Sequence, residues 1–337
     1  MLKPATAVLL LNVGTPEGPE RSKVRKFLAE FLNDRRVIDI PWLLRKFLVN
    51  LIIVPLRATR SAKLYKRLWT VKGSPLLYYG ISLKEKLQQK LGDEYVVEFA
   101  TSYQQPAIKE IVNKVLEQNI SSIIAFPLFP QYASSTTGSA VEKLLEIISA
   151  QTNIPAINTI LKYYDHPLYL EAMAARISNY DYAGYDHILM SFHGLPLSQV
   201  NNSHNGRACE HYNCTKEVTE QNAYCYNAAC YATSRLLAEK LSIDRSRFTV
   251  CFQSRIAKKW LSPFTDDIII KLAGEGKQKL LVICPSFTAD CLETLIEVGQ
   301  NYRDLFLRHG GEKLTLVESL NDSEFWVTAI SGIISEH

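Results

Sequence analysis

Four of the seven cysteines fall within one short polar segment, with the spacing Cys209-x4-Cys214-x10-Cys225-x4-Cys230. Reduced thiols at this density indicate a metal centre, because thiolates bind soft and borderline metal ions. Four thiolates satisfy either a tetrahedral zinc ion or an iron–sulfur cluster. The x4 spacing departs from the x2 pairs of zinc ribbons and mildly disfavours zinc. His204 and His211 are substitute ligands, but four cysteines already complete a site.

A histidine lies where an apolar run is broken. His187–Met190 predicts a strand, and Gly194 and Pro196 end it immediately after His193. An imidazole at a carboxyl strand end can bind a metal ion or accept a proton near neutral pH. The alternative is a structural histidine that caps the strand.

Carboxylates follow another predicted strand, which ends at Cys284. Asp290 and Glu293 have the spacing of a capping box, so the simplest interpretation is a helix start. Glu293 and Glu297 are four residues apart and share one helix face. Two close carboxylates can form an oxygen-ligand track for a divalent cation and can relay protons.

The N-terminal part of the chain is basic and contains an amphipathic stretch. Residues 1–67 hold 14 Lys/Arg and 5 Asp/Glu, although the whole chain has a net charge of only +4. Residues 41–55 are apolar apart from a narrow polar stripe of Arg45, Lys46 and Asn50. The stretch is too short to span a bilayer, so it predicts either a buried helix or a lip that faces a membrane or a lipophilic ligand.

The elements that must position these groups alternate along the chain. The 337 residues are 47% hydrophobic and 21% charged, which is typical of a globular protein and excludes a disordered one. β-branched apolar runs alternate with helical patterns, which predicts an α/β class with two doubly wound lobes and parallel sheets. Ligands of such folds bind beyond the carboxyl ends of the strands. The expected strands are 8–13, 95–101, 122–127, 187–192, 248–252, 279–284 and 313–318.

Six segments, taken in order, resemble the ferrochelatase family, whose members insert iron in the terminal step of haem synthesis. Each segment is modest alone, but together they cover nearly the whole chain. The segments are Leu10-Leu11-Asn12-Val13-Gly14-Thr15-Pro16-Glu17, Gly73-Ser74-Pro75-Leu76, Pro130-Gln131-Tyr132 with Ser135-Thr136-Thr137, Ser191-Phe192-His193-Gly194, Phe252-Gln253-Ser254-Arg255 and Asp290-Cys291-Leu292-Glu293-Thr294-Leu295.

The resemblance implies two Rossmann-like lobes around a porphyrin cleft, which we place at residues 1–165 and 166–337. The first would carry the amphipathic lip, at about 41–67, and the second the cysteine-rich insertion, at about 201–230. The resemblance further assigns His193 and Glu293 as the paired catalytic residues. His193, Glu293 and Glu297 would bind the substrate Fe²⁺, with His193 as proton acceptor and Glu293 as the carboxylate that delivers iron. Tyr103 and Arg67 would contact the porphyrin.

The cysteines depart from the animal members of the family, because no cysteine follows Cys291. Some bacterial members resemble this chain in carrying an internal four-cysteine motif for a [2Fe-2S] cluster. We therefore expect such a cluster on Cys209, Cys214, Cys225 and Cys230, with structural Zn²⁺ as the alternative. Cys291 stands where many members have histidine, so we do not expect it to be essential.

The expected activity is insertion of Fe²⁺ into protoporphyrin IX to form protohaem. The alternatives are a chelatase for coproporphyrin or sirohydrochlorin, or a non-catalytic haem- or iron-sensing protein on the same fold. The N-terminus lacks the pattern of a secretory signal, so we expect a cytoplasmic protein that contacts the surface of the cytoplasmic membrane transiently and binds no nucleic acid.

Overall fold

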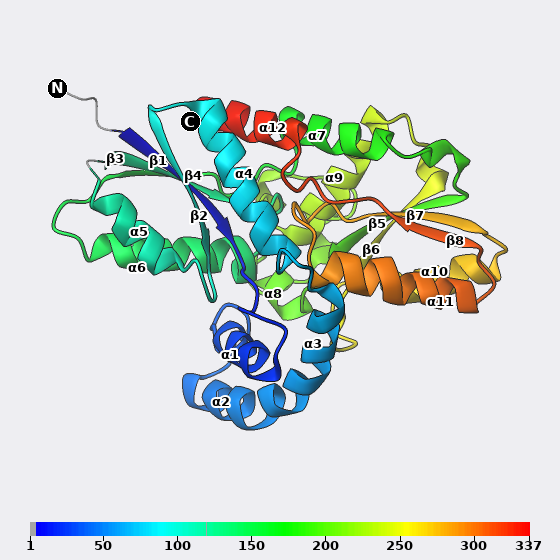
Figure 1. Ribbon diagram of the computed structural model, residues 1–337. Coiled ribbons are helices and arrows are strands. Elements are labelled where there is room, and N and C mark those ends of the chain that lie inside the picture. The colour runs from blue at the N-terminus through cyan, green and yellow to red at the C-terminus, as the bar shows by residue number, and fades with distance from the viewer. Residues whose placement is uncertain (1–4, 119) are drawn as a thin grey trace. The chain divides into compact units, whose positions relative to one another are not determined.

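The computed structural model describes residues 5–118 and 120–337, and these fold as two compact units, each built around a parallel four-stranded sheet (Figure 1). The α/β class predicted from the alternating pattern is confirmed. The units are not contiguous in sequence. Unit 1 holds the described residues of Met1–Phe129 together with Ala133–Leu161 and Ile330–His337, and unit 2 holds Pro130–Tyr132 and Lys162–Ala329.

The sheet of unit 1 has the strand order β2-β1-β3-β4, and all three pairings are parallel. Its strands are β1 (Ala5–Asn12), β2 (Tyr95–Thr101), β3 (Ile120–Pro127) and β4 (Ala156–Thr159). The central strand β1 is apolar on both faces because helices cover both sides of such a sheet. On one face Leu9 and Leu11 pack with Val112 of α5 (Ile108–Leu116) and Leu144 of α6 (Ser139–Ser149).

The remaining helices of unit 1 include one long helical run. α2 (Trp42–Phe47), the π-helix η1 (Leu48–Ile53) and α3 (Val54–Leu68) follow one another without a break. The other elements are α1 (Arg21–Leu32), α4 (Pro75–Leu91) and η2 (Ser134–Gly138). α4 lies close against β2, since a Cβ at Gly80 would come within 2.4 Å of the ring of Phe99.

The sheet of unit 2 has the order β6-β5-β7-β8, again with parallel pairings only. Its strands are β5 (His187–His193), β6 (Phe248–Gln253), β7 (Lys279–Ile283) and β8 (Lys313–Leu316). In the register of β5 with β6, His193 lies beside Gln253. The carboxyl ends of the central strands therefore meet at one edge, where folds of this type hold their ligands.

Helices pack on this sheet through a continuous apolar core. Leu189 and Val282 of the strands contact a cluster that includes Ile269, Val298 and Phe306. The longer helical elements are α7 (Pro167–Ser178), α8 (Leu197–Asn202), α9 (Tyr226–Lys240), α10 (Thr265–Gly274), η7 (Leu292–Tyr302), α11 (Arg303–Arg308) and α12 (Glu324–Ser335), which ends in unit 1. The 3₁₀ turns are η3 (Tyr182–Gly184), η4 (Cys209–Tyr212), η5 (Glu220–Asn222) and η6 (Arg245–Arg247).

Several elements differ from the sequence expectations. The strand β4 is absent from the expected strands, because it has only four residues and follows a proline. The strand β1 begins at Ala5 rather than at residue 8, and β3 begins at Ile120 rather than at residue 122. Among the described residues, none of the helices combines the length and the hydropathy that crossing a bilayer requires.

Candidate active site and metal centre

His193 ends strand β5 and is held on several sides. Its backbone N–H donates to Ser286 Oγ at 3.4 Å, and its backbone carbonyl accepts from the Tyr226 hydroxyl at 3.0 Å. The ring Nδ1 lies 2.7 Å from the carbonyl oxygen of Gly194. A carbonyl can only accept, so Nδ1 carries the hydrogen and the neutral ring presents a lone pair at Nε2. A lone pair at this position can bind a metal ion or accept a proton.

Two aromatic rings flank this imidazole. The ring centroids of Trp260 and Phe287 lie 6.4 and 6.3 Å from that of His193. They make the surroundings of His193 partly apolar, and the imidazole itself is half-buried.

Glu293 and Glu297 lie on the π-helix η7 rather than on an α-helix. A π-helix is rare and is found frequently at functional sites. With about one turn between them, both carboxylates stay on the same side of the helix. Glu297 interacts electrostatically with both Glu293 and His193, so the three predicted residues share one neighbourhood within unit 2.

Residues at the end of strand β6 form hydrogen bonds with both glutamates. Ser254 adopts a left-handed backbone conformation, with φ of +64°, and both its backbone N–H and its Oγ donate to the carboxylate of Glu297. Tyr302 donates to the same carboxylate at 2.8 Å. The Gln253 side-chain amide donates to the backbone carbonyl of Glu293 at 3.2 Å. A non-glycine residue at positive φ is uncommon and clusters at functional sites.

The protonation of Glu297 is shifted by this environment. Burial raises the pKa of its carboxyl group, and the neighbouring charge of Glu293 raises it further. The hydrogen bonds from Ser254 and Tyr302, together with His193, oppose the rise in pKa without cancelling it. A carboxyl group with a raised pKa exchanges protons closer to neutral pH than an exposed glutamate does.

The sequence analysis proposed the two glutamates and the histidine but named no role for the residues that contact them. Ser254 lies in a quoted motif, yet nothing local shows that it turns to Glu297. Tyr302 lies five residues after Glu297, a separation that becomes informative only once the helix is known to be a π-helix. Asp290 acts mainly as a structural anchor, since it accepts hydrogen bonds from Thr294, the Ser319 backbone and Asn321.

A second group of ligand-type side chains lies in the cysteine-rich segment. His204, Cys209, Cys214 and Cys225 are all buried, and their candidate ligand atoms all lie within 4.8 Å of one another. Cys230 is equally buried but is not a member of this group. The structure thus brings together three of the four predicted cysteines and adds His204. Three thiols and an imidazole are a donor set that can hold a metal ion.

The thiols of this group perturb one another. Cys209 Sγ lies 3.6 Å from Cys225 Sγ and accepts from the side-chain amide of Asn227 at 3.3 Å. The hydrogen bond from Cys225, assisted by Asn227, lowers the pKa of the Cys209 thiol to about 5. Deprotonated thiols are the form that binds metal ions.

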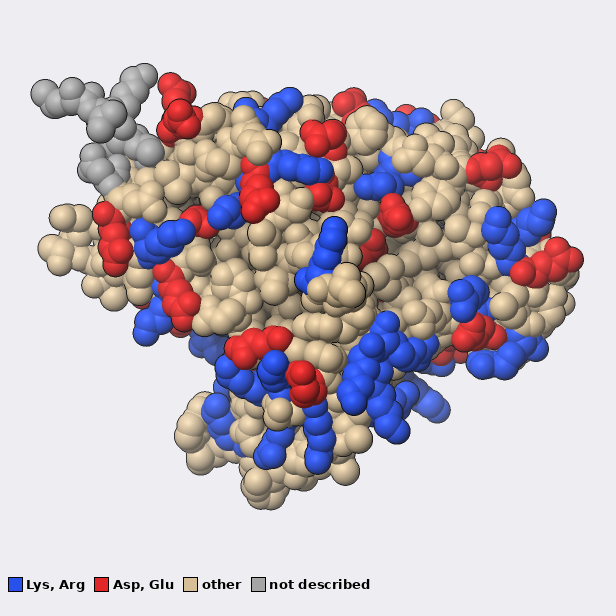
Figure 2. All heavy atoms as spheres, viewed as in Figure 1, with Lys and Arg blue, Asp and Glu red and all other residues tan. Residues whose placement is uncertain are grey.

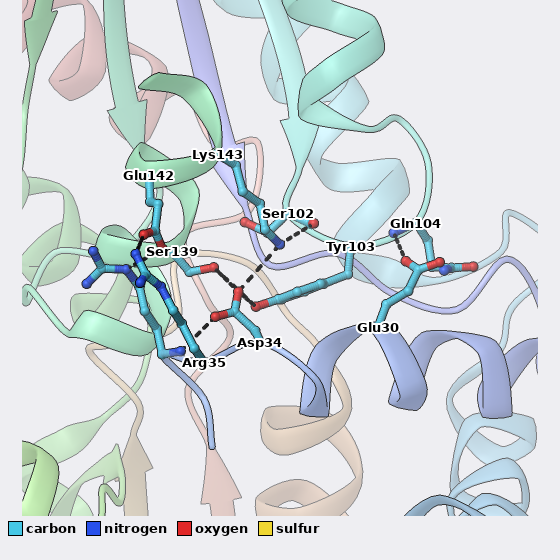
Figure 3. Close-up of polar contacts among 10 residues, drawn as sticks. Glu30, Asp34, Arg35, Ser102, Tyr103, Gln104, Ser139, Glu142 and Lys143 are labelled. Carbon is cyan, nitrogen blue, oxygen red and sulfur yellow. Dashed lines mark hydrogen bonds and ion pairs between the residues drawn. The ribbon is translucent and has the colours of Figure 1, made fainter. Parts of the chain in front are cut away.

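Tyr103 lies in a buried polar network of unit 1 (Figure 3). Its hydroxyl donates to Asp34 Oδ2 at 2.7 Å, and Ser139 donates to the same oxygen at 2.6 Å. The Lys143 ammonium lies 3.6 Å from the centre of the Tyr103 ring. Burial raises the pKa of Tyr103, and the neighbouring Asp34 charge adds to the rise. The hydroxyl is therefore neutral and fully engaged within the protein.

Arg67 lies on the exposed side of α3, also in unit 1. The porphyrin contacts expected for Tyr103 and Arg67 stay predictions.

The fold places the chain among chelatase-like α/β proteins. Two similar solved structures are SirB from Bacillus subtilis with Fe³⁺ and the sirohydrochlorin chelatase SirB from Bacillus subtilis subspecies spizizenii in complex with cobalt. Their TM-scores are 0.55 and 0.54 at 11% and 10% identity. Each match covers 98% of this chain, with 95% and 94% of the respective structure. At such low identity the similarity concerns the fold alone.

Sequence similarity defines the family. The profile of the ferrochelatase family matches residues 5–337. A ferrochelatase of Coxiella burnetii (strain Dugway 5J108-111) is 41% identical over 327 residues, covering 96% of this chain and 91% of the relative. A ferrochelatase of Legionella pneumophila (strain Lens) is 40% identical over 330 residues, covering 98% of both chains. The chain belongs to the ferrochelatase family, and the expected family resemblance is confirmed.

Replacing Glu297 with glutamine should change how stability depends on pH. Below the pKa of an unfolded glutamate, about 4.3, the carboxyl is protonated in both states, so the two proteins should have similar stability. As pH rises through the raised pKa of the folded state, the wild-type protein loses the stabilisation of the protonated form, and Glu297→Gln should gain stability relative to it. Urea midpoints measured between pH 4 and 8 would reveal this trend.

The matched control for that series is Glu239→Gln, since Glu239 lies exposed on α9 of the same unit. A stability difference between Glu297→Gln and wild type that is flat with pH, or that falls as pH rises, would contradict the assigned environment of Glu297.

Proposed function

We propose that this chain inserts Fe²⁺ into protoporphyrin IX to form protohaem and releases the two pyrrole protons, which is the last step of haem synthesis. Membership of the ferrochelatase family supports an iron-inserting lyase. The observation that carries the assignment to particular residues is the shared neighbourhood of His193, Glu293 and Glu297. An imidazole lone pair and two carboxylates are the groups that metal insertion requires.

The chemistry asks for two tasks to be done together. The pyrrole N–H groups must lose two protons while the nitrogens become ligands of the incoming Fe²⁺, so charge balances. A protein that binds a bent ring exposes the nitrogen lone pairs and holds the porphyrin part-way to the transition state. A base close to the ring must accept the protons. A ligand that binds Fe²⁺ only moderately must then release it to the pyrrole nitrogens.

We assign the proton-accepting task to His193. The hydrogen bond of Nδ1 to the Gly194 carbonyl supports this role, because it leaves Nε2 as the acceptor. We assign iron delivery to Glu293, whose carboxylate oxygens suit a divalent cation. Glu297 continues the carboxylate path, and its raised pKa suits it to pass protons onward. Tyr103 and Arg67 remain our proposed porphyrin contacts.

The cysteine-rich segment is proposed to hold a metal centre. A [2Fe-2S] cluster is the occupant that the family resemblance implies, and tetrahedral Zn²⁺ is the alternative. The donor set fits either group, since His204 supplies the fourth donor beside three cysteines. Such a centre would cross-link the segment. One ligand, Cys225, directly precedes Tyr226, whose hydroxyl bonds the His193 carbonyl, so the centre would also help to hold the end of β5.

We further propose that unit 1 docks on an anionic membrane surface through an apolar lip. The lip consists of exposed side chains on α2, η1 and α3. They are Trp42, Leu43, Leu44, Phe47, Leu51, Ile52 and Leu56. Leu43 and Leu51 are 74% and 64% exposed, which is unusual for clustered leucines. Lys and Arg side chains gather over α1–α3 on the face seen in Figure 2. Apolar side chains among basic ones are typical of an interfacial contact with anionic lipid.

The catalytic proposal predicts that His193→Ala will reduce kcat/KM for haem formation by about 10²–10⁴-fold, the usual contribution of a positioned base. The assay combines purified protein, Fe²⁺ and protoporphyrin IX under anaerobic conditions. His309→Ala is the control, because His309 is exposed at the end of α11 in the same unit. Porphyrin fluorescence checks that the variant still binds substrate.

Two results would contradict the catalytic proposal. Wild-type turnover in His193→Ala would remove this residue from the mechanism. A wild-type protein that binds porphyrin and iron but forms no haem would favour a sensing role instead.

The docking proposal predicts that Leu43→Glu combined with Leu51→Glu will weaken binding to phosphatidylglycerol vesicles by at least about tenfold. Burial of one leucine contributes about 1.5–3 kcal/mol, and about 1.4 kcal/mol is a tenfold change. Sedimentation with vesicles measures the bound fraction. Leu145→Glu, at another exposed leucine of unit 1, is the control. Equal binding of the double variant and wild type would contradict the lip.

A further inference from the structure

The cysteine-rich segment gathers a ligand set that differs from the one its spacing predicts. We propose that His204, Cys209, Cys214 and Cys225 are the complete set of protein ligands of one metal centre, and that Cys230 is not a ligand. The inference rests on the proposed metal centre and not on the chelatase reaction. The ligand set is the same whether the occupant is a zinc ion or an iron–sulfur cluster.

The donor atoms already lie at distances typical of coordination. A zinc–sulfur bond of about 2.3 Å gives a tetrahedron whose edges are about 3.8 Å. Cys209 Sγ and Cys225 Sγ are 3.6 Å apart, and Cys214 Sγ lies 3.3 Å from His204 Nε2. All members lie within 4.8 Å of one another. These separations are close to those expected between the donors of a single metal ion.

His204 is oriented toward this point rather than packed as an ordinary core side chain. Only 2% of its surface is exposed, and its ring stacks on Tyr212 with centroids 4.3 Å apart and planes 10° apart. Within the described part of the chain, its buried Nδ1 has no hydrogen-bond partner. Burial removes the hydrogen bonds that the imidazole would form with water. Because Nδ1 has no partner, only Nε2 can form an interaction that replaces them. That nitrogen faces the thiols, where a metal ion would bind it.

Neighbouring amides support the thiolates and the loop. The Asn227 amide donates to Cys209 Sγ, which is the kind of outer hydrogen bond that metal ligands usually receive. Asn222 donates to the carbonyls of Tyr212 and Glu217 and so closes the loop between the ligands. Between α8 and α9 the segment contains only short 3₁₀ turns, so little regular structure holds it in place. Metal-coupled folding is common in segments of this type.

Helix geometry excludes Cys230 from the same centre. Cys225 is the N-cap of α9, and Cys230 lies five residues further along that helix. The backbone of Cys225 is extended, with ψ of 117°, whereas Cys230 lies inside the helix, and its thiol is not among the ligand atoms that lie within 4.8 Å of one another. Cys230 is instead fully buried in the protein core and is not a member of the group of ligand atoms. The x4 interval between Cys225 and Cys230 therefore does not place both thiols at one centre in this structure.

Metal content after anaerobic purification tests the proposal. Iron, zinc and sulfide per chain are measured for wild type, His204→Ala, Cys209→Ala and Cys230→Ala, together with the absorption spectrum. His211→Ala is the matched control, because His211 is an exposed histidine of the same segment. Reconstitution with Zn²⁺ alone, or with Fe²⁺ and sulfide, identifies the occupant in parallel arms.

One of the two reconstitutions should load the wild-type protein with metal. In that reconstitution we expect Cys230→Ala and His211→Ala to bind as much metal as the wild type does. His204→Ala and Cys209→Ala should lose it, or bind at least about 100-fold more weakly, since loss of an outer hydrogen bond alone costs about 10–100-fold. His204→Cys should restore binding with an altered spectrum. Retention of metal by His204→Ala together with its loss in Cys230→Ala would overturn the ligand set, as would a wild type that takes up neither occupant.

X-ray absorption on the wild-type protein keeps the proposal testable if a variant fails to fold. We expect one nitrogen ligand and three protein sulfur ligands per centre, and a shell of four cysteine sulfurs would overturn it. This measurement does not use turnover, so an inactive protein with an intact centre would count against the proposed reaction and not against the ligands.

Discussion

The hydrogen bonds between Ser254 and Glu297 hold the candidate active site together. They connect the end of strand β6 to the π-helix η7, and the register of β6 with β5 places the same strand end beside His193. Ser254 donates twice because its backbone is left-handed, a conformation that costs about 1–3 kcal/mol for a residue with a side chain. Two charge-assisted hydrogen bonds to a buried carboxylate can offset that cost. The bond from the Gln253 side chain to the Glu293 carbonyl is a further connection between this strand end and η7.

The same arrangement sets the chemistry of the site. Burial and the nearby Glu293 raise the pKa of Glu297, whereas the hydrogen bonds keep its position fixed. The Nδ1 hydrogen of His193 is donated to a backbone carbonyl, so Nε2 is the nitrogen with a lone pair. A neutral base and a carboxyl group that titrates closer to neutral pH can pass protons between them at little cost in free energy. Metal insertion needs such a pair, because protons leave the macrocycle as the ion enters.

Much of this site could be predicted from local sequence. The apolar run before His193 and the break at Gly194 were enough to place the histidine at a strand end, and the interval between Glu293 and Glu297 placed both on one side of a helix. The π-helical winding was not predicted, because the spacing of Glu293 and Glu297 places them on one side of either kind of helix. The role of Ser254 depends on its φ and on a partner 43 residues away. The same limit applies to Cys230 and His204. The spacing of cysteines in the sequence does not show where α9 begins, and that start determines which thiols lie close together.

The central claim is that His193 and Glu293 form one site for the substrate metal. A crystal structure of the wild-type protein soaked anaerobically with Co²⁺ in place of Fe²⁺ tests it most directly, because anomalous scattering locates the ion. The account predicts a peak within about 2.0–2.2 Å of the His193 Nε2 or a Glu293 carboxylate oxygen, the range of metal bonds to these donors. Ordered metal elsewhere in the protein, with neither side chain bound at a saturating concentration, would contradict it.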